Sequence, residues 1–364
     1  MADALKHMVD RAVVEDIAAR LTRVAPDFDA AAFVDDLIAA LPELELKPRM
    51  EAIARRIATG LPDDYRAALQ VIVEVAKDKP PIEGFAAWPL CTFVEIFGVD
   101  DPAVSLNAME HLTKRASCEF AVRPFLSTHW DAAYAKLAEF TTSDDETVRR
   151  LSSEGTRPRL PWGMRVPRLI EDPDPGLALL ARLRTDPSET VRRSVANHLN
   201  DVAKDHPGLV VATVRDWAAA DPPADHRMLS HALRTLVKAG NPEALDALGF
   251  TTAASLDVLE FSVTPDGVSM GDHIALEARL QSTAAAEQHL VVDFVIHHVN
   301  AAGGTSPKVF KWKTLTIEPG EKVILRKRRM IQQASTRTYR AGTHRVELQV
   351  AGTVVAATAF DVVV

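Results

Sequence analysis

The chain has 364 residues, of which 47% are apolar and 25% are charged. These are ordinary values for a globular protein, they exclude a disordered or fibrous chain, and the length suffices for two or three domains. The net charge of −8, taken alone, argues against a partner as acidic as nucleic acid. Two cysteines, Cys91 and Cys118, are too few for a disulfide framework or a four-cysteine zinc site and indicate a reducing compartment.

The beginning of the chain lacks the apolar core of a signal peptide, and no run of about 18 apolar residues occurs in the sequence. We therefore expect a cytoplasmic protein without a membrane partner.

The apolar pattern changes near residue 252. Before it, apolar residues recur every three or four positions, as at Ala68, Ile72 and Val75, which predicts helices. Beyond it, short runs of strand-forming residues alternate with turn signals such as Pro319-Gly320. We expect an all-α solenoid over residues 1–250 and an all-β immunoglobulin-like or fibronectin-like sandwich over residues 252–364. The clearest strand runs are residues 261–263, 291–295, 346–350 and 362–364.

The helical part contains an internal repeat. The segment Glu-Thr-Val-Arg-Arg occurs at residues 146–150 and again at 189–193, and a weaker copy begins at Asp100. Aspartate or serine precedes both Glu-Thr-Val-Arg-Arg copies, in a position to cap the first turn of a helix,. A helical period in the low forties is typical of HEAT helix pairs, so we predict a HEAT-like repeat solenoid.

The net charge conceals an uneven distribution. Residues 1–100 carry 11 basic and 18 acidic side chains, whereas residues 147–168 carry six arginines against Glu154, and residues 303–345 carry 11 basic side chains against two glutamates. Two basic regions in one chain favour a polyanion such as DNA. The alternative is that the arginines pair with acids of the next repeat and the strand residues form a solvated face. The candidate DNA-binding residues are Arg149, Arg150, Arg157, Arg159, Arg192, Arg193, Lys308, Lys311, Lys313, Arg326, Lys327, Arg328 and Arg329.

Glu154 is a candidate catalytic acid. The helix that begins near Asp144 should end at Gly155 with a left-handed cap, because Pro158 cannot continue it. Glu154 then lies at the negative end of the helix dipole, which disfavours a carboxylate, and among arginines. Such an acid suits chemistry with charged intermediates. The alternative is a structural ion pair with Arg150, one turn earlier.

Three further residues are candidates. Trp162 lies in a predicted loop, where it can bind a cationic or stacked base or fill a small satellite core. Asp201 lies on the polar face of a predicted helix, which alone indicates only a solvated face. Glu119 lies near a helix end that Pro124 is expected to stop, and its role can equally be structural.

Motifs for metal or cofactor chemistry are absent from the sequence. There is no H-E-x-x-H pair, no phosphate-binding loop and no dinucleotide-binding turn,. His297 and His298 are adjacent in a predicted strand and so point to opposite faces. We predict no metal site and no cofactor.

Three segments carry a resemblance to a known family: residues 148–163, 191–201 and 231–241. They resemble the bacterial DNA alkylation-repair glycosylases of the AlkC type, relatives of AlkD that are built from HEAT-like helix pairs. The trailing sandwich resembles the extra domain of one AlkC subgroup. The resemblance implies base excision repair by hydrolysis of the N-glycosidic bond of cationic bases, 3-methyladenine and 3-methylcytosine, without a cofactor. It also matches Glu119, Glu154 and Asp201 to the family's active-site acids and Trp162 to its active-site aromatic residue.

This chemistry suits the residues, because carboxylates can stabilise an oxocarbenium-like sugar and orient the attacking water. We expect a monomer that binds double-stranded DNA containing alkylated bases, with the sandwich clamping the DNA. Whether the base is flipped remains open. Two alternatives also remain: a non-enzymatic HEAT-repeat scaffold, and a DNA-binding protein of the same fold without catalysis.

Overall fold

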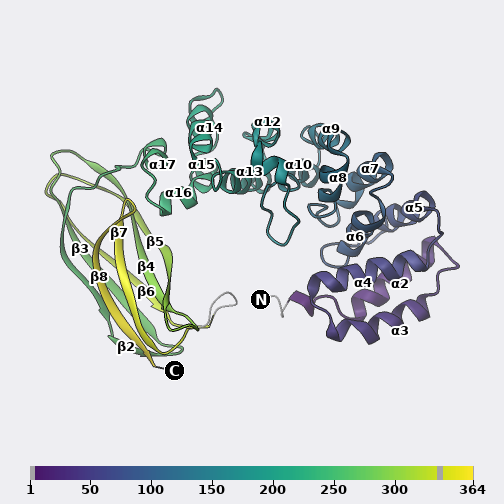
Figure 1. The fold of residues 1–364 in the computed structure, drawn as a ribbon, viewed down its shortest axis with the longest axis horizontal. Helices are drawn as coiled ribbons and strands as arrows, with labels where there is room; N and C mark the ends of the chain where they lie inside the picture. Colours follow the sequence, from purple (N-terminus) through teal and green to yellow (C-terminus); the bar gives the residue numbers. More distant parts are fainter. Residues whose placement is uncertain (1–4, 334–338, 364) are drawn as a thin grey trace. The chain divides into compact units, whose positions relative to one another are not determined.

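The structure, a computed structural model, describes residues 5–333 and 339–363. Helices occupy the first part of the chain and strands the last part (Figure 1), so the predicted order of an all-α region and an all-β sandwich is confirmed. Val364, the end of the last predicted strand run, lies outside the described residues. The helices are α2 (Arg11–Val24), α3 (Ala30–Ala40), η1 (Leu41–Glu43), α4 (Leu46–Thr59), α5 (Tyr65–Ala76), α6 (Trp88–Phe97), α7 (Pro102–Leu112), α8 (Arg123–Thr128), α9 (Trp130–Phe140), α10 (Glu146–Glu154), α11 (Pro167–Glu171), α12 (Asp174–Leu183), α13 (Glu189–Val202), α14 (Pro207–Ala219), α15 (His226–Ala232), α16 (Arg234–Lys238) and α17 (Pro242–Ala247).

The chain forms two compact units. One comprises Met1–Asp205 and Ala220–Ala232 and is called the helical unit below; the other comprises His206–Ala219 and Leu233–Val364 and is called the sandwich unit. Helices α14, α16 and α17 therefore belong with the strands. The change from helix to strand, between α17 and β1, does not coincide with the division into units.

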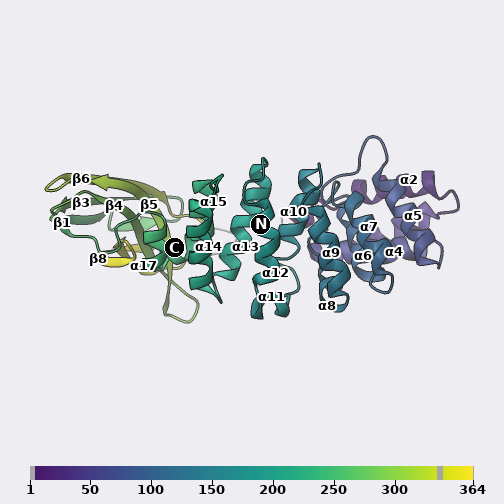
Figure 2. The same cartoon turned by 90° about the horizontal axis from the view of Figure 1, so that it is seen from above.

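In the helical unit, neighbouring helices lie side by side along the chain (Figure 2), with α4 against α6, α5 against α7, and α10 against α13. The apolar faces of the helices from α2 to α12 contribute to one core, in which Ile53, Phe93 and Leu137 are almost completely buried. Burial of such side chains is the main stabilising contribution to a helix stack. No helix in the described part of the chain is long and apolar enough to cross a membrane.

The first arginine of each Glu-Thr-Val-Arg-Arg segment makes similar contacts in the two copies. Arg149 donates to two carbonyl oxygens of the turn before α10 and binds Asp186 through two nitrogens, at 2.6 and 3.0 Å. Arg192 likewise donates to two carbonyl oxygens before α13, and its Nε lies 3.6 Å from Asp225 Oδ2. In each copy, the first arginine stabilises the turn that precedes its helix and pairs with an acid further along the chain.

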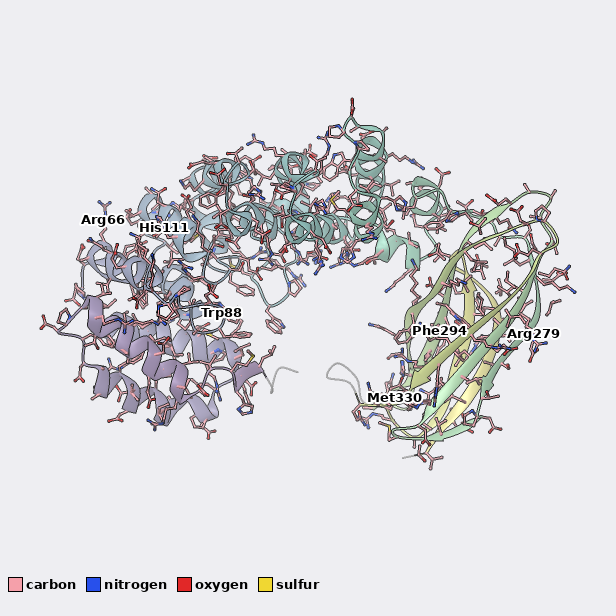
Figure 3. All side chains as sticks on the ribbon, turned by 180° about the vertical axis from the view of Figure 1, so that it is seen from behind. Arg66, Trp88, His111, Arg279, Phe294 and Met330 are labelled. Atoms are coloured by element: carbon pink, nitrogen blue, oxygen red, sulfur yellow. The ribbon has the colours of Figure 1, made fainter. Side chains whose placement is uncertain are left out.

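The strands form two sheets. The order is β1-β3-β6 in one and β2-β8-β7-β4-β5 in the other, and Phe294 of β4 is buried in the core between them (Figure 3). The turn signal Pro319-Gly320 separates β5 from β6, as expected. The strands are β1 (Leu256–Thr264), β2 (Gly267–Ser269), β3 (His273–Ser282), β4 (Gln288–Val299), β5 (Thr305–Ile317), β6 (Lys322–Met330), β7 (Gly342–Val350) and β8 (Thr353–Val363).

Two local predictions are wrong. Gly155 does end α10, but its φ is −65°, so it is not a left-handed cap. The glycine is needed instead for close packing, because a Cβ there would lie 2.7 Å from Val122 Cγ1 and 2.8 Å from the Leu151 carbonyl oxygen. Pro124 does not stop a helix; it lies in the first turn of α8, where a missing N–H breaks no helical hydrogen bond,. Glu119 therefore lies in the turn between α7 and α8.

Candidate active site

A buried guanidinium joins two of the three predicted acids. Glu154 is the last residue of α10 and Asp201 lies near the end of α13, with exposed fractions of 5% and 2%. Arg157 Nη1 donates to Glu154 Oε1 at 2.6 Å, and Arg157 Nε donates to Asp201 Oδ2 at 2.8 Å. Burial opposes the charge of this arginine, but the two carboxylates outweigh it and raise the pKa of Arg157,.

The remaining carboxylate oxygens also have partners. Ser194 Oγ donates to Glu154 Oε2 at 2.6 Å, and Lys204 Nζ donates to Asp201 Oδ1 at 2.8 Å. Both acids are therefore held in defined positions. Asp201 does not lie on a solvated helix face, because this side of α13 is buried.

The third predicted acid, Glu119, joins the same network. Its Oε2 accepts hydrogen bonds from Ser117 Oγ at 2.7 Å and Arg150 Nη1 at 3.1 Å. The other terminal nitrogen of Arg150 lies 3.6 Å from Glu154 Oε2. Arg150 thus links Glu119 to Glu154 as Arg157 links Glu154 to Asp201, and the tertiary structure brings the three acids together.

Glu119 and Glu154 line a pocket of about 450 Å³. Much of its remaining wall is aromatic and includes Trp88, Phe120 and Trp162. The rings of Trp88 and Phe120 are stacked with centroids 5.4 Å apart. Asp201 does not line the pocket. It is hydrogen-bonded to Arg157, which does line it. Carboxylates beside aromatic faces favour a cationic ligand, because both groups attract positive charge.

Trp162 has an unusual backbone. Its φ is +64°, a left-handed conformation that costs a residue with a Cβ on the order of 1 kcal/mol,. Its side chain is 60% exposed, which excludes the alternative that it fills a satellite core. Lys47 Nζ donates to the Trp162 carbonyl oxygen at 3.0 Å.

Arg123 supports the loop that carries Trp162. It is fully buried and donates to the carbonyl oxygens of Gly155, at 2.8 Å, Arg157, at 2.9 Å, and Met164. Burial, followed by the nearby charge of Arg157, lowers the pKa of Arg123 to about 10. Sequence reasoning missed Arg123, Lys47 and the two stacked rings, because no local signal connects them with a loop tens of residues away.

Other arginines of residues 147–168 are also engaged. Arg149 pairs with Asp186, and Arg159 binds Asp205 through two hydrogen bonds of 2.8 Å. Arg168 lies over the Trp130 ring, 4.1 Å from its centroid. The local excess of positive charge along the sequence is therefore largely offset by acids from other repeats.

The next repeat presents a second pocket, of about 220 Å³. It is lined by Arg192 and Arg193 of α13 and by Arg227 and His231 of α15, together with Glu189 and Asp225. Arg193 is exposed and its bond of 2.7 Å to Glu189 is solvent-accessible. These two predicted DNA-binding arginines therefore lie outside the acid cluster.

The basic residues of the sandwich differ in their surroundings. Arg326 donates to Glu277 at 2.7 Å, and Arg329 lies 3.8 Å from the centroid of the Phe310 ring. Lys327 and Arg328 are exposed on β6 and make no ion pair with the described residues. Three more exposed lysines, Lys308, Lys311 and Lys313, lie on β5, an edge strand.

Residues 5–333 and 339–363 contain no group of three or more side chains that could hold a metal ion. The adjacent histidines of β4 have different surroundings. His297 Nε2 lies 2.9 Å from Glu347 Oε2, whereas His298 is buried beside the ring of Tyr339.

Three comparisons with known proteins identify relatives of this chain. Residues 257–364 match the family model described as the C-terminal Ig-like domain of uncharacterised protein YhaZ. The chain is 33% identical to the uncharacterized protein YhaZ of Bacillus subtilis (strain 168) over 355 residues, 97% of this chain and 98% of that protein.

Among solved structures, the alkylpurine DNA glycosylase AlkC of Pseudomonas fluorescens, bound to DNA containing an abasic site analog, superposes with a TM-score of 0.93. The two are 35% identical, and 99% of each chain is covered. The similarity extends over both the helices and the sandwich, and it confirms the resemblance found in the sequence. The chain therefore belongs to the AlkC family of alkylpurine DNA glycosylases, in the group that carries a C-terminal Ig-like domain.

Proposed function

We propose that this protein is a DNA glycosylase that hydrolyses the N-glycosidic bond of cationic alkylated bases, 3-methyladenine and 3-methylcytosine, in double-stranded DNA. Membership of the AlkC family supports glycosylase activity on alkylated bases. These two bases are the ones that the resemblance found in the sequence implies, and a site where acids and aromatic rings surround one pocket suits their positive charge,.

The observation that carries the proposal is the position of Glu119 and Glu154 on the wall of that aromatic pocket. A base methylated at a ring nitrogen already bears a positive charge and leaves without a general acid. What needs stabilising is the positive charge that develops on the sugar, and fixed carboxylates do this without reorganising during the reaction.

The three acids take different parts in this proposal. Glu154 lines the pocket and stabilises the oxocarbenium-like sugar, and Asp201, behind Arg157, acts with it to position the attacking water. Glu119 supports Glu154 through Arg150. Trp162, exposed at the pocket, contacts the cationic nucleotide. The chemistry uses protein side chains and water only.

The phosphates of the DNA are neutralised in this proposal by exposed cations in both units. In the sandwich unit, Lys327 and Arg328 are the best placed, because they are exposed and make no ion pair with the described residues. The lysines of β5 are exposed as well. In the helical unit, Arg193 is the corresponding exposed arginine. The enzyme acts as a monomer.

The test is base release from methylated duplex DNA. Wild type is expected to release 3-methyladenine and 3-methylcytosine, and Glu154→Gln to release them at least about 100-fold more slowly, because the amide carries no negative charge. Glu74→Gln, which changes an exposed glutamate paired with Lys77, serves as the matched control and should retain full activity. If wild type releases no base, the proposed function is wrong; full release by Glu154→Gln would move the catalytic role to another residue.

A further inference from the structure

The geometry points to Lys47 as a positioning residue that holds Trp162 at the active-site pocket. Lys47 belongs to α4, more than a hundred residues before the loop that it contacts. The inference rests on the proposed function, because it assigns Trp162 a role in catalysis. Its structural consequence can nevertheless be measured without any activity.

The ammonium group of Lys47 makes two contacts with the pocket. It donates to the Trp162 carbonyl oxygen at 3.0 Å, and it lies 4.9 Å from the centroid of the Phe120 ring. Phe120 is itself stacked on Trp88. Lys47 therefore joins two sides of the pocket: the stacked aromatic pair and the loop that carries the exposed indole.

The loop requires such support at this point. Trp162 has a positive φ, a conformation that persists only where surrounding contacts impose it,. Its side chain is largely exposed and has little packing to impose that conformation. The backbone must therefore be held, and the hydrogen bond from Lys47 acts directly on the peptide group of Trp162.

Lys47 and Arg123 hold different parts of the same loop. Arg123 binds carbonyl oxygens at residues 155, 157 and 164, on both sides of the tip. At the tip itself, the Gly163 amide donates to Leu160 at 3.1 Å, and Lys47 binds the carbonyl between these two residues. Since Arg123 is fully buried, its loss would perturb the whole region, whereas loss of Lys47 should affect the tip alone.

The experiment compares Lys47→Met with Lys47→Arg. Methionine keeps an apolar chain but donates no hydrogen bond, whereas arginine keeps both the charge and a donor. The charge matters because Lys47 also stabilises the charged form of the half-buried Glu95, opposing the rise in its pKa that burial causes. Lys136→Met is the matched control, since Lys136 likewise lies over a phenylalanine ring, that of Phe140 at 5.2 Å, away from the pocket.

We expect Lys47→Met to lower kcat for base release by about tenfold with KM unchanged within about twofold, since loss of orientation affects the chemical step more than binding. Lys47→Arg should regain most of the rate, and Lys136→Met should keep it. In a Trp162→Ala background, Lys47→Met should cause almost no further loss, because the two residues act as one unit.

Amide hydrogen exchange of residues 160–164 tests the same inference without activity. Lys47→Met should lower the protection of the Gly163 amide by about tenfold or more, while Lys136→Met leaves it unchanged. Failure of wild type to release bases would overturn the proposed function, and the exchange measurement would still decide the role of Lys47. Unchanged exchange of the Gly163 amide in Lys47→Met would overturn the inference. A raised KM together with a weaker salt dependence of DNA binding would also overturn it, because it would show that Lys47 contacts a phosphate.

Discussion

Glu154 and Asp201 lie on different helices, yet both carboxylates accept a hydrogen bond from one guanidinium, that of Arg157. The planar fork of arginine allows two nitrogens to donate in fixed directions. The two acids are thereby held at a set separation before any substrate arrives. Arg157 also lines the pocket, so the same residue holds both acids and faces the pocket.

Replacing Arg157 tests this arrangement. Arg157→Gln should lower the single-turnover rate of base release on the order of 100-fold, because misplacing a catalytic group by about 1 Å has that effect. Arg157→Lys should recover little, since one ammonium group cannot reproduce the two directed hydrogen bonds. The measurement is release of 3-methyladenine at saturating enzyme. A variant faster than wild type would show instead that Arg157 suppresses the acids.

Arg149 distinguishes a structural from a DNA-binding role. Its pair with Asp186 is largely buried, with side-chain exposures of 13% and 3%. Arg149→Gln should therefore destabilise the helical unit by about 3–5 kcal/mol, because it leaves a buried carboxylate without its partner. The control is Arg193→Gln, which changes an exposed arginine of the next repeat and should change stability by less than about 1 kcal/mol,. Denaturant unfolding measures both. Unchanged stability of Arg149→Gln, with weaker DNA binding, would contradict the structural role.

The basic strand β6 offers a matched set of variants. Replacing Lys327 and Arg328 by glutamine should reduce the slope of log Kd against log salt by about 1–2, since each lost phosphate contact removes about 0.9. Arg326→Gln should change it less, because Arg326 is already paired with Glu277. Point substitutions are preferable to deleting residues 252–364, which would divide the compact sandwich unit. Equal slopes for wild type and the double variant would exclude this strand from the DNA interface.

Because Asp293 is buried, we expect the stability of the sandwich unit to depend on pH. It is 2% exposed, and burial raises its pKa to about 6, although Lys238 and Lys311 oppose the shift. Between the ordinary value near 3.8 and about 6, the folded state binds more protons than the unfolded state, so stability falls as pH rises through this window,.

Asp293→Asn should remove that dependence. Near neutral pH it should stabilise the sandwich unit by up to about 3 kcal/mol, since a pKa unit corresponds to about 1.4 kcal/mol, and near pH 4 the gain should vanish. Thermal unfolding at several pH values measures the effect, with Asp257→Asn, at an exposed position of β1, as the control. A gain in stability of equal size at both pH values would show that it does not come from the raised pKa of Asp293.

Local patterns in the sequence determined the order of the elements. Apolar spacing separated helices from strands, and the returning Glu-Thr-Val-Arg-Arg segment identified the repeat. The same reasoning placed Glu154 at a helix end and Trp162 in a loop, because both depend on a few neighbouring residues, among them Gly155 and Pro158,. Motif resemblance added the family.

The tertiary structure alone decided which charges meet. Counting charge along the chain placed a cationic segment around Glu154, but acids from other repeats, such as Asp186 and Asp205, pair with its arginines. Likewise, Asp201 is buried, although its helix face is polar in sequence. Lys47 reaches Trp162 only because α4 packs near that loop. Helix periodicity is set by residues within two turns, whereas an ion pair or a positioning contact depends on side chains that only the packed repeats bring together.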